Sequence, residues 1–109
     1  MVASISASEL KQKLQAAPSG DGLLLLDVRE TDEFEYCRIH GSLNIPLSQI
    51  TRRIGELSPD RETVVICHHG MRSQQAAMFL EQNDFSSVFN LAGGVAAWAN
   101  DIDPEMPRY

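Results

Sequence analysis

Two apolar segments constrain the fold of this chain more than any other feature. Residues 23–28 read Leu-Leu-Leu-Leu-Asp-Val, and residues 63–66 read Thr-Val-Val-Ile. A continuous apolar run, rather than an alternating one, is typical of a parallel strand that is buried on both faces. Weaker strand candidates are residues 43–46 and 87–91, and the helical candidates between the strands are residues 6–16, 31–35, 47–57, 72–83 and 95–100.

This alternation of strands and helices predicts an α/β fold, with a mainly parallel sheet and helices on both of its faces. The chain has 109 residues, a length that suits one compact domain, and we expect residues 1–109 to form it. A Ser6–Glu9 capping box is expected to start the first helix, and the Pro- and Gly-containing segment 17–22 is expected to end it in a turn. Two prolines in residues 103–109 predict an extended tail.

Composition excludes several classes of function. The formal net charge is −6, which is the wrong sign for general binding to nucleic acid or to an anionic membrane. The first residues lack the basic and apolar pattern of a signal peptide, and the run 23–26 is far too short to cross a bilayer. Two cysteines do not make a disulfide framework. We therefore expect a cytoplasmic protein.

The chemistry is expected in the loop that follows the second buried strand. This loop reads Cys67-His68-His69-Gly70-Met71-Arg72-Ser73 and leads into a helix. A sulfur at a helix N-terminus faces unpaired N–H groups and the positive end of the helix dipole, so its pKa should fall. The thiolate is the nucleophilic form, and Cys67 is therefore the predicted catalytic residue.

Charged side chains near the loop are expected to assist the cysteine. Arg72 offers a forked set of donors that suits an oxyanion. Asp27 and Arg29 end the first buried strand, and we expect them to brace the loops, with Glu33 paired to Arg29. Arg38 is either a further positive charge at the pocket or a solvated side chain. Because adjacent residues rarely point the same way, at most one of the loop histidines is expected to face the pocket.

Four segments of the chain resemble the rhodanese-like family of single-domain sulfurtransferases. They are residues 25–30 with 33–34, residue 39 with 41–46, residues 64–73 and residues 91–98, and they follow one another in the family's order. The resemblance implies a compact α/β domain in which Cys67 carries the transferred sulfur as a persulfide and residues 68–72 cradle it. It implies no metal and no organic cofactor.

The same resemblance implies thiosulfate or persulfides as sulfur donors. Cyanide, cellular thiols or a partner protein are the acceptors that it implies. Where the family commonly reads Gly-His-Ile-Pro-Gly-Ala, this chain has Cys37-Arg38-Ile39-His40-Gly41-Ser42, so the wall near the active loop differs here.

Three other functions stay open at this level. A cysteine-dependent phosphatase would need five residues between Cys and Arg and a general acid, whereas this loop has four and no evident acid. A zinc site would draw on Cys37 and His40 or on residues 67–69. A binding or regulatory module of the same fold would be expected to lose the nucleophile.

Cys37 itself is expected to be an unreactive buried thiol rather than a disulfide partner of Cys67. Trp98 is expected to be a core residue.

Overall fold

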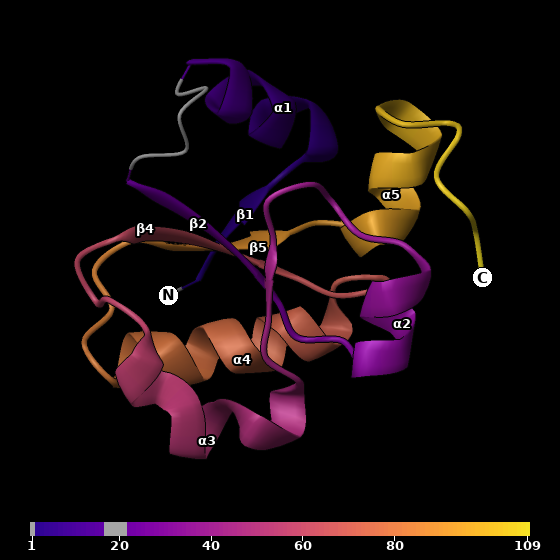
Figure 1. The fold of residues 1–109 in the computed structure, drawn as a ribbon. Helices are drawn as coiled ribbons and strands as arrows, with labels where there is room; N and C mark the ends of the chain where they lie inside the picture. The colour runs from indigo at the N-terminus through magenta and orange to yellow at the C-terminus, as the bar shows by residue number, and fades with distance from the viewer. Residues whose placement is uncertain (1, 17–21) are drawn as a thin grey trace.

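A five-stranded parallel sheet forms the centre of the molecule in the computed structural model, which describes residues 2–16 and 22–109 (Figure 1). The strand order is β1-β5-β4-β2-β3, and every neighbouring pair runs parallel. The strands are β1 (Ala3–Ile5), β2 (Leu23–Asp27), β3 (Leu43–Asn44), β4 (Glu62–Ile66) and β5 (Val88–Leu91). The predicted α/β fold with a mainly parallel sheet is confirmed.

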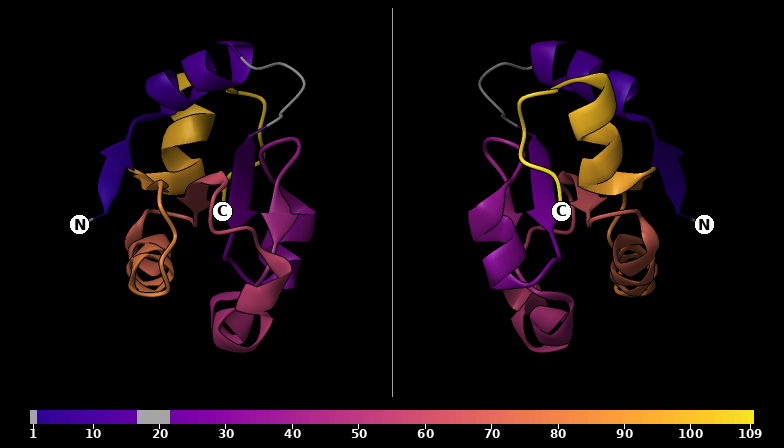
Figure 2. Two further views of the ribbon diagram at one scale, coloured as in Figure 1. Left: turned by 90° about the vertical axis from the view of Figure 1, so that its left-hand side faces the viewer. Right: turned by 90° about the vertical axis from the view of Figure 1, so that its right-hand side faces the viewer.

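Helices cover both faces of this sheet, with α1 and α5 on one side and α3 and α4 on the other (Figures 1 and 2). The α-helices are α1 (Ala7–Ala16), α2 (Thr31–Tyr36), α3 (Ile50–Arg53), α4 (Met71–Gln82) and α5 (Gly94–Asp101). In the described part of the chain, none of them is long and apolar enough to cross a membrane.

The local signals explain most of these boundaries. The predicted Ser6–Glu9 capping box is present, since each backbone N–H is bonded to the other residue's side chain at 2.9 and 3.1 Å. The helix expected over residues 47–57 is instead split into the 3₁₀ turn η1 (Leu47–Gln49), α3 and the 3₁₀ turn η2 (Ile54–Glu56). Gly55, a poor helix former, lies in the last of these. The turn expected at residues 17–22 lies mostly outside the described residues.

The apolar run of β2 is explained by two hydrophobic cores. Leu23 and Leu25 pack into the core on the α1 and α5 side, whereas Leu24 and Leu26 pack into the core on the α3 and α4 side. Because successive side chains of a strand point to opposite faces, a strand between two cores must be apolar at every position. This arrangement fixes the register that brings the ends of β2 and β4 together.

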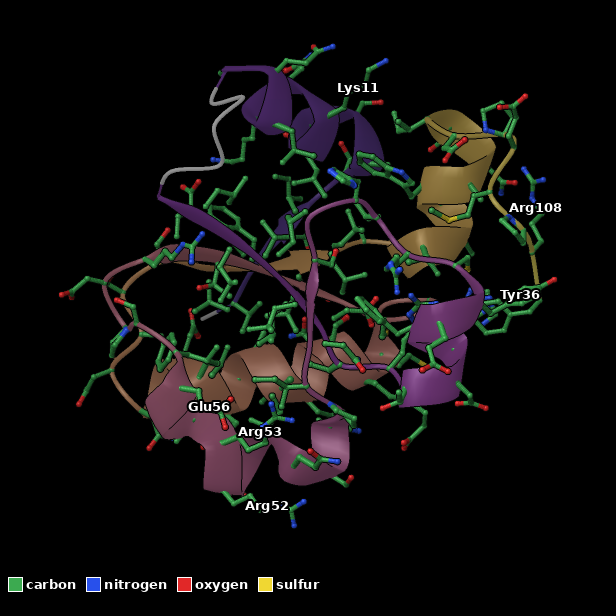
Figure 3. All side chains as sticks on the ribbon, viewed as in Figure 1. Lys11, Tyr36, Arg52, Arg53, Glu56 and Arg108 are labelled. Atoms are coloured by element: carbon green, nitrogen blue, oxygen red, sulfur yellow. The ribbon has the colours of Figure 1, made fainter. Side chains whose placement is uncertain are left out.

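The segment after α5 contains no helix, as its prolines predict. Met106 is 6% exposed and belongs to the core that contains Trp98. The hydroxyl of Tyr36 lies 3.5 Å from the carbonyl oxygen of Arg108, and the two residues lie close together at the α2 side of the tail in Figure 3. The tail therefore runs from α5 toward α2, across the end of the sheet at which β2 and β4 finish.

Candidate functional site

The candidate site lies where β2 and β4 end side by side. Asp27, the last residue of β2, is paired in register with Ile66, the last residue of β4, so the loops that follow Asp27 and Ile66 leave neighbouring strands at the same edge. The loop after β4 is short and enters α4 at Met71. In open parallel sheets, this edge is where ligands bind.

The sulfur of Cys67 is held by hydrogen-bond donors. The Gly70 N–H donates to Sγ at 3.0 Å and the Ser73 hydroxyl at 3.3 Å. Burial alone would raise the pKa of Cys67, because the residue is only 1% exposed. The Ser73 hydroxyl and the N–H groups of Ser73, Gly70 and His69 oppose burial and leave the pKa below its ordinary value.

Backbone conformation makes this arrangement possible. Gly70 has φ of +103° and precedes the first residue of α4. This left-handed conformation suits glycine and strains residues that have a Cβ. Gly70 thus turns its own N–H back toward the sulfur and allows α4 to begin one residue later.

A polar residue of β5 holds the loop from the other side. Asn90 Oδ1 lies very close to the Ser73 hydroxyl and competes with the sulfur for its one proton, and the amide nitrogen of Asn90 donates to the Gly70 carbonyl at 3.1 Å. This role was not predicted from the sequence. The signal for it is a polar side chain within an otherwise apolar strand next to β4, because a buried amide must find partners.

The start of α5 also fixes the loop. The N–H groups of Val95 and Ala96 donate to the carbonyls of Cys67 and His68 at 2.9 and 3.1 Å. This approach is so close that a Cβ on Gly94 would stand 2.2 Å from the Cys67 carbonyl oxygen. The loop is therefore bonded to α4, β5 and α5 at once, and its geometry is set before any substrate arrives.

Arg72 is bound by a carboxylate of α2. Its two terminal nitrogens contact the two Glu33 oxygens at 2.6 and 2.9 Å. The Arg72 bond lowers the pKa of Glu33 to about 2, even though partial burial opposes this. The predicted pairing of Glu33 with Arg29 is wrong, because the Glu33 side chain turns to Arg72 and only its backbone carbonyl accepts from Arg29. The expected role of Arg72 in holding an anionic donor stays a prediction.

Asp27 and Arg29 form an ion pair with no solvent exposure. Arg29 Nη2 lies 2.7 Å from Asp27 Oδ2, and its Nε contacts both carboxylate oxygens at 3.0 Å. The same guanidinium donates to the Cys37 carbonyl at 2.5 Å and to the Tyr109 hydroxyl at 2.9 Å. It thereby joins the loop after β2, the end of α2 and the tail.

Tyr109 connects this ion pair to the Arg72 pair. Its hydroxyl accepts from Arg29 and donates to Glu33 Oε2 at 2.9 Å. Burial and the Glu33 carboxylate raise the pKa of Tyr109 to about 12, although Arg29 works in the opposite direction. No sequence pattern singled out this residue, because its partners lie 76 and 80 positions away in the chain.

The two loop histidines point the same way. Their rings stack at 4.0 Å, and the Tyr109 ring stacks on His68 at 4.0 Å on its other side. Both histidines line a cavity of about 130 Å³ between α5 and the tail. The expectation that at most one of them faces the sulfur stays a prediction, although the stacking shows that adjacent side chains can share one direction when an aromatic ring of the tail packs beside them. In the described residues, neither ring is hydrogen-bonded to the Cys67 sulfur.

The remaining predicted residues lie around this centre. Met71 is the first residue of α4, and it is 78% exposed. Arg38 is exposed, stacks over the Phe34 ring at 4.7 Å, and makes its one described hydrogen bond to the carbonyl of that residue. Cys37 is buried and free, in the core on the opposite side of the sheet from Cys67. Trp98 is a core residue, as expected. Among residues 2–16 and 22–109, no three His, Cys, Asp or Glu side chains gather as around a metal ion.

The fold and this loop define a class of α/β proteins that carry a cysteine within a ring of N–H groups, between a strand and a helix. Comparison with known proteins names the family. The family model of the rhodanese-like domain matches residues 6–101, so the chain belongs to the rhodanese-like family. This confirms the resemblance noted in the sequence.

Individual relatives agree with this assignment. The chain is 36% identical to a sulfurtransferase of Allochromatium vinosum over 91% of its own length and 90% of the relative's. It is 37% identical to the putative sulfur carrier protein YrkF of Bacillus subtilis over 91% of its own length and 52% of the relative's. The crystal structure of a rhodanese-related protein from Thermoplasma volcanium superposes with a TM-score of 0.80 at 33% identity and covers 92% of this chain and 93% of that one. Other curated relatives are longer, and the chain spans as little as 21% of their length.

Proposed function

We propose that this protein is a sulfurtransferase that accepts a sulfur atom on Cys67 as a persulfide and passes it to a thiol-like acceptor. One observation carries the proposal: the Cys67 sulfur lies inside a ring of N–H and O–H donors that lowers its pKa. The names of the relatives support it, since they include a sulfurtransferase and a putative sulfur carrier.

The first half-reaction is an attack by the Cys67 thiolate on the outer sulfur of the donor. For a persulfide donor R–S–S⁻, a bond forms between the Cys67 sulfur and the outer sulfur of the donor. The donor S–S bond breaks, R–S⁻ leaves with the electron pair, and Cys67 becomes the persulfide Cys67–S–S⁻. For thiosulfate, sulfite leaves instead. Charge is conserved in both cases, and the enzyme needs no oxidant. The donors that stabilise the thiolate also stabilise the anionic persulfide.

The second half-reaction regenerates the enzyme. An acceptor thiolate attacks the outer sulfur of Cys67–S–S⁻, takes it as a new persulfide, and leaves Cys67 as the thiolate. Cyanide would take the same sulfur as thiocyanate. Because both steps use one nucleophile, the kinetics should be ping-pong. The net charge of −6 favours a basic protein as the acceptor wherever the acceptor is a protein.

The proposed roles follow from the contacts. Cys67 is the nucleophile, and Gly70 and Ser73 stabilise negative charge on its sulfur. His69 adds its backbone N–H, whereas His68 and Met71 form part of the rim around the loop. Asp27, Arg29 and Arg72 hold the surrounding segments together, and the exposed Arg38 is proposed only as a peripheral charge.

Intact mass spectrometry tests the proposal. The protein is incubated with thiosulfate or with an alkyl persulfide, and we expect a mass increase of one sulfur atom that cyanide or a reducing thiol removes. Cys67→Ser should gain no sulfur, whereas Cys37→Ser should gain it as the wild type does. A wild-type protein that stays unmodified with every donor would favour a binding module. Phosphate release from an aryl phosphate that depends on Cys67 would favour a phosphatase.

A further inference from the structure

Arg72, the positively charged residue of the cysteine loop, is already bound to a carboxylate. Both terminal nitrogens of Arg72 are bonded to Glu33, and the Glu33 side chain is only 18% exposed. The Tyr109 hydroxyl donates a further hydrogen bond to the same carboxylate. A small anion that needs the terminal donors of Arg72 must displace a carboxylate that has three hydrogen bonds from side chains.

Two arginines at this edge of the sheet are each paired with a carboxylate. Arg29 is balanced by Asp27, and Arg72 is balanced by Glu33. The two neighbouring imidazoles stack on each other, and the proximity of His69 helps to lower the pKa of His68 after the larger effect of burial. With both arginines paired to carboxylates, the thiolate itself makes the mouth of the site negative. The net charge of −6 over the whole chain adds to the repulsion.

Resting on the proposed function, we propose that Glu33 determines donor specificity. It serves as an internal anion that occupies Arg72, is positioned by Tyr109, and makes the site discriminate against small dianionic donors such as thiosulfate. The favoured donor is then a persulfide on an otherwise uncharged carrier, which brings a single negative charge on the sulfur that reacts. The discrimination arises because a dianion meets twice the repulsion of a monoanion, while Glu33 neutralises Arg72 and holds both of its terminal nitrogens.

Glu33→Gln is the direct test. Glutamine can still accept the Glu30 N–H that Glu33 accepts at 3.0 Å in the capping box of α2, so the helix start is kept. The substitution removes the competing charge from Arg72. The rate of Cys67 sulfuration is measured for each variant with thiosulfate and with the persulfide of N-acetylcysteamine, whose carrier thiol has no other charge.

We expect Glu33→Gln to raise the thiosulfate-to-persulfide ratio of kcat/KM by at least about tenfold, because one unit of charge changes next to a dianion. Tyr109→Phe keeps the ring but removes the hydroxyl that holds Glu33, and it should move the ratio in the same direction by a smaller factor. Glu35→Gln is the matched control: it makes the same charge change on the same helix at an exposed position, and the ratio should stay within about twofold because exposed charges are screened.

Ionic strength gives a second measurement. Wild-type sulfuration by thiosulfate should become faster with added KCl, and this dependence should be weaker in Glu33→Gln. An unchanged or lower ratio in Glu33→Gln, with sulfuration still occurring, would overturn the specificity proposal and leave the proposed function intact. Failure of both donors to modify Cys67 in every variant would overturn both.

Discussion

Ser73→Ala should reduce the reactivity of Cys67 without unfolding the protein. The hydroxyl lies 3.3 Å from the sulfur and donates either to it or to Asn90, but it has only one proton. A hydrogen bond to a charged acceptor contributes about 1.5–3 kcal/mol, and sharing the proton between two acceptors roughly halves this. We therefore expect the thiolate to lose about 1 kcal/mol of stabilisation, which is about a fivefold smaller thiolate fraction below the thiol pKa.

The assay is the pH dependence of alkylation by iodoacetamide in a Cys37→Ser background, so that Cys67 is the one thiol that reacts. The profile of Ser73→Ala should shift to higher pH, because the pKa of Cys67 is lowered in part by this hydroxyl. The shift should be partial, since the Gly70 N–H remains at 3.0 Å. Ser48→Ala, at an exposed position outside the site, serves as the control. An unshifted profile, or a shift to lower pH, would refute the assignment of the hydroxyl as a donor to the sulfur.

Three further predictions concern stability. Asp27→Asn should cost about 3–5 kcal/mol of unfolding free energy in urea, because it leaves the charge of Arg29 buried without its partner; a loss below about 1 kcal/mol would contradict this. Gly94→Ala should cost at least about 2 kcal/mol by the same measurement, since its Cβ would stand 2.2 Å from the Cys67 carbonyl oxygen. In the folded protein the pKa of Glu33 is lowered to about 2. The contribution of Glu33 to the free energy of unfolding is therefore complete above its unfolded pKa near 4.5 and is lost as the pH falls toward 2. Glu33→Gln should therefore flatten the fall in stability between pH 5 and pH 2, and an identical acid transition would contradict the ion pair.

The sheet and the cysteine loop were accessible to sequence reasoning because their signals are local. The apolar run of β2 requires burial on both faces, and the order of strand, cysteine, glycine and helix places Cys67 at a helix start. The strand β1 was missed, since three residues with two exposed side chains carry no pattern. Its position at the edge of the sheet depends on pairing with β5, more than 80 residues later in the chain.

The partners within the site were harder to predict because they depend on side-chain direction and on distant segments. Glu33 is four positions from Arg29, a spacing that suggests a pair, but the buried Asp27 takes that guanidinium and leaves Glu33 to Arg72. The capping residue of α2 is Glu30, and the box it forms orients Glu33. Asn90 and Tyr109 enter the site only when β5 and the tail have been placed by the fold.

The buried guanidinium of Arg29 implies that this position tolerates no other cation. Its planar fork reaches a carboxylate, a main-chain carbonyl and a phenol in three different directions. A lysine ammonium, with three donors at one point, cannot span all of them and would need rehydration that the surrounding core does not allow. Relatives that keep the tail tyrosine should therefore keep this arginine, and loss of the arginine should loosen Tyr109 from this edge of the sheet while Met106 keeps the rest of the tail in the core.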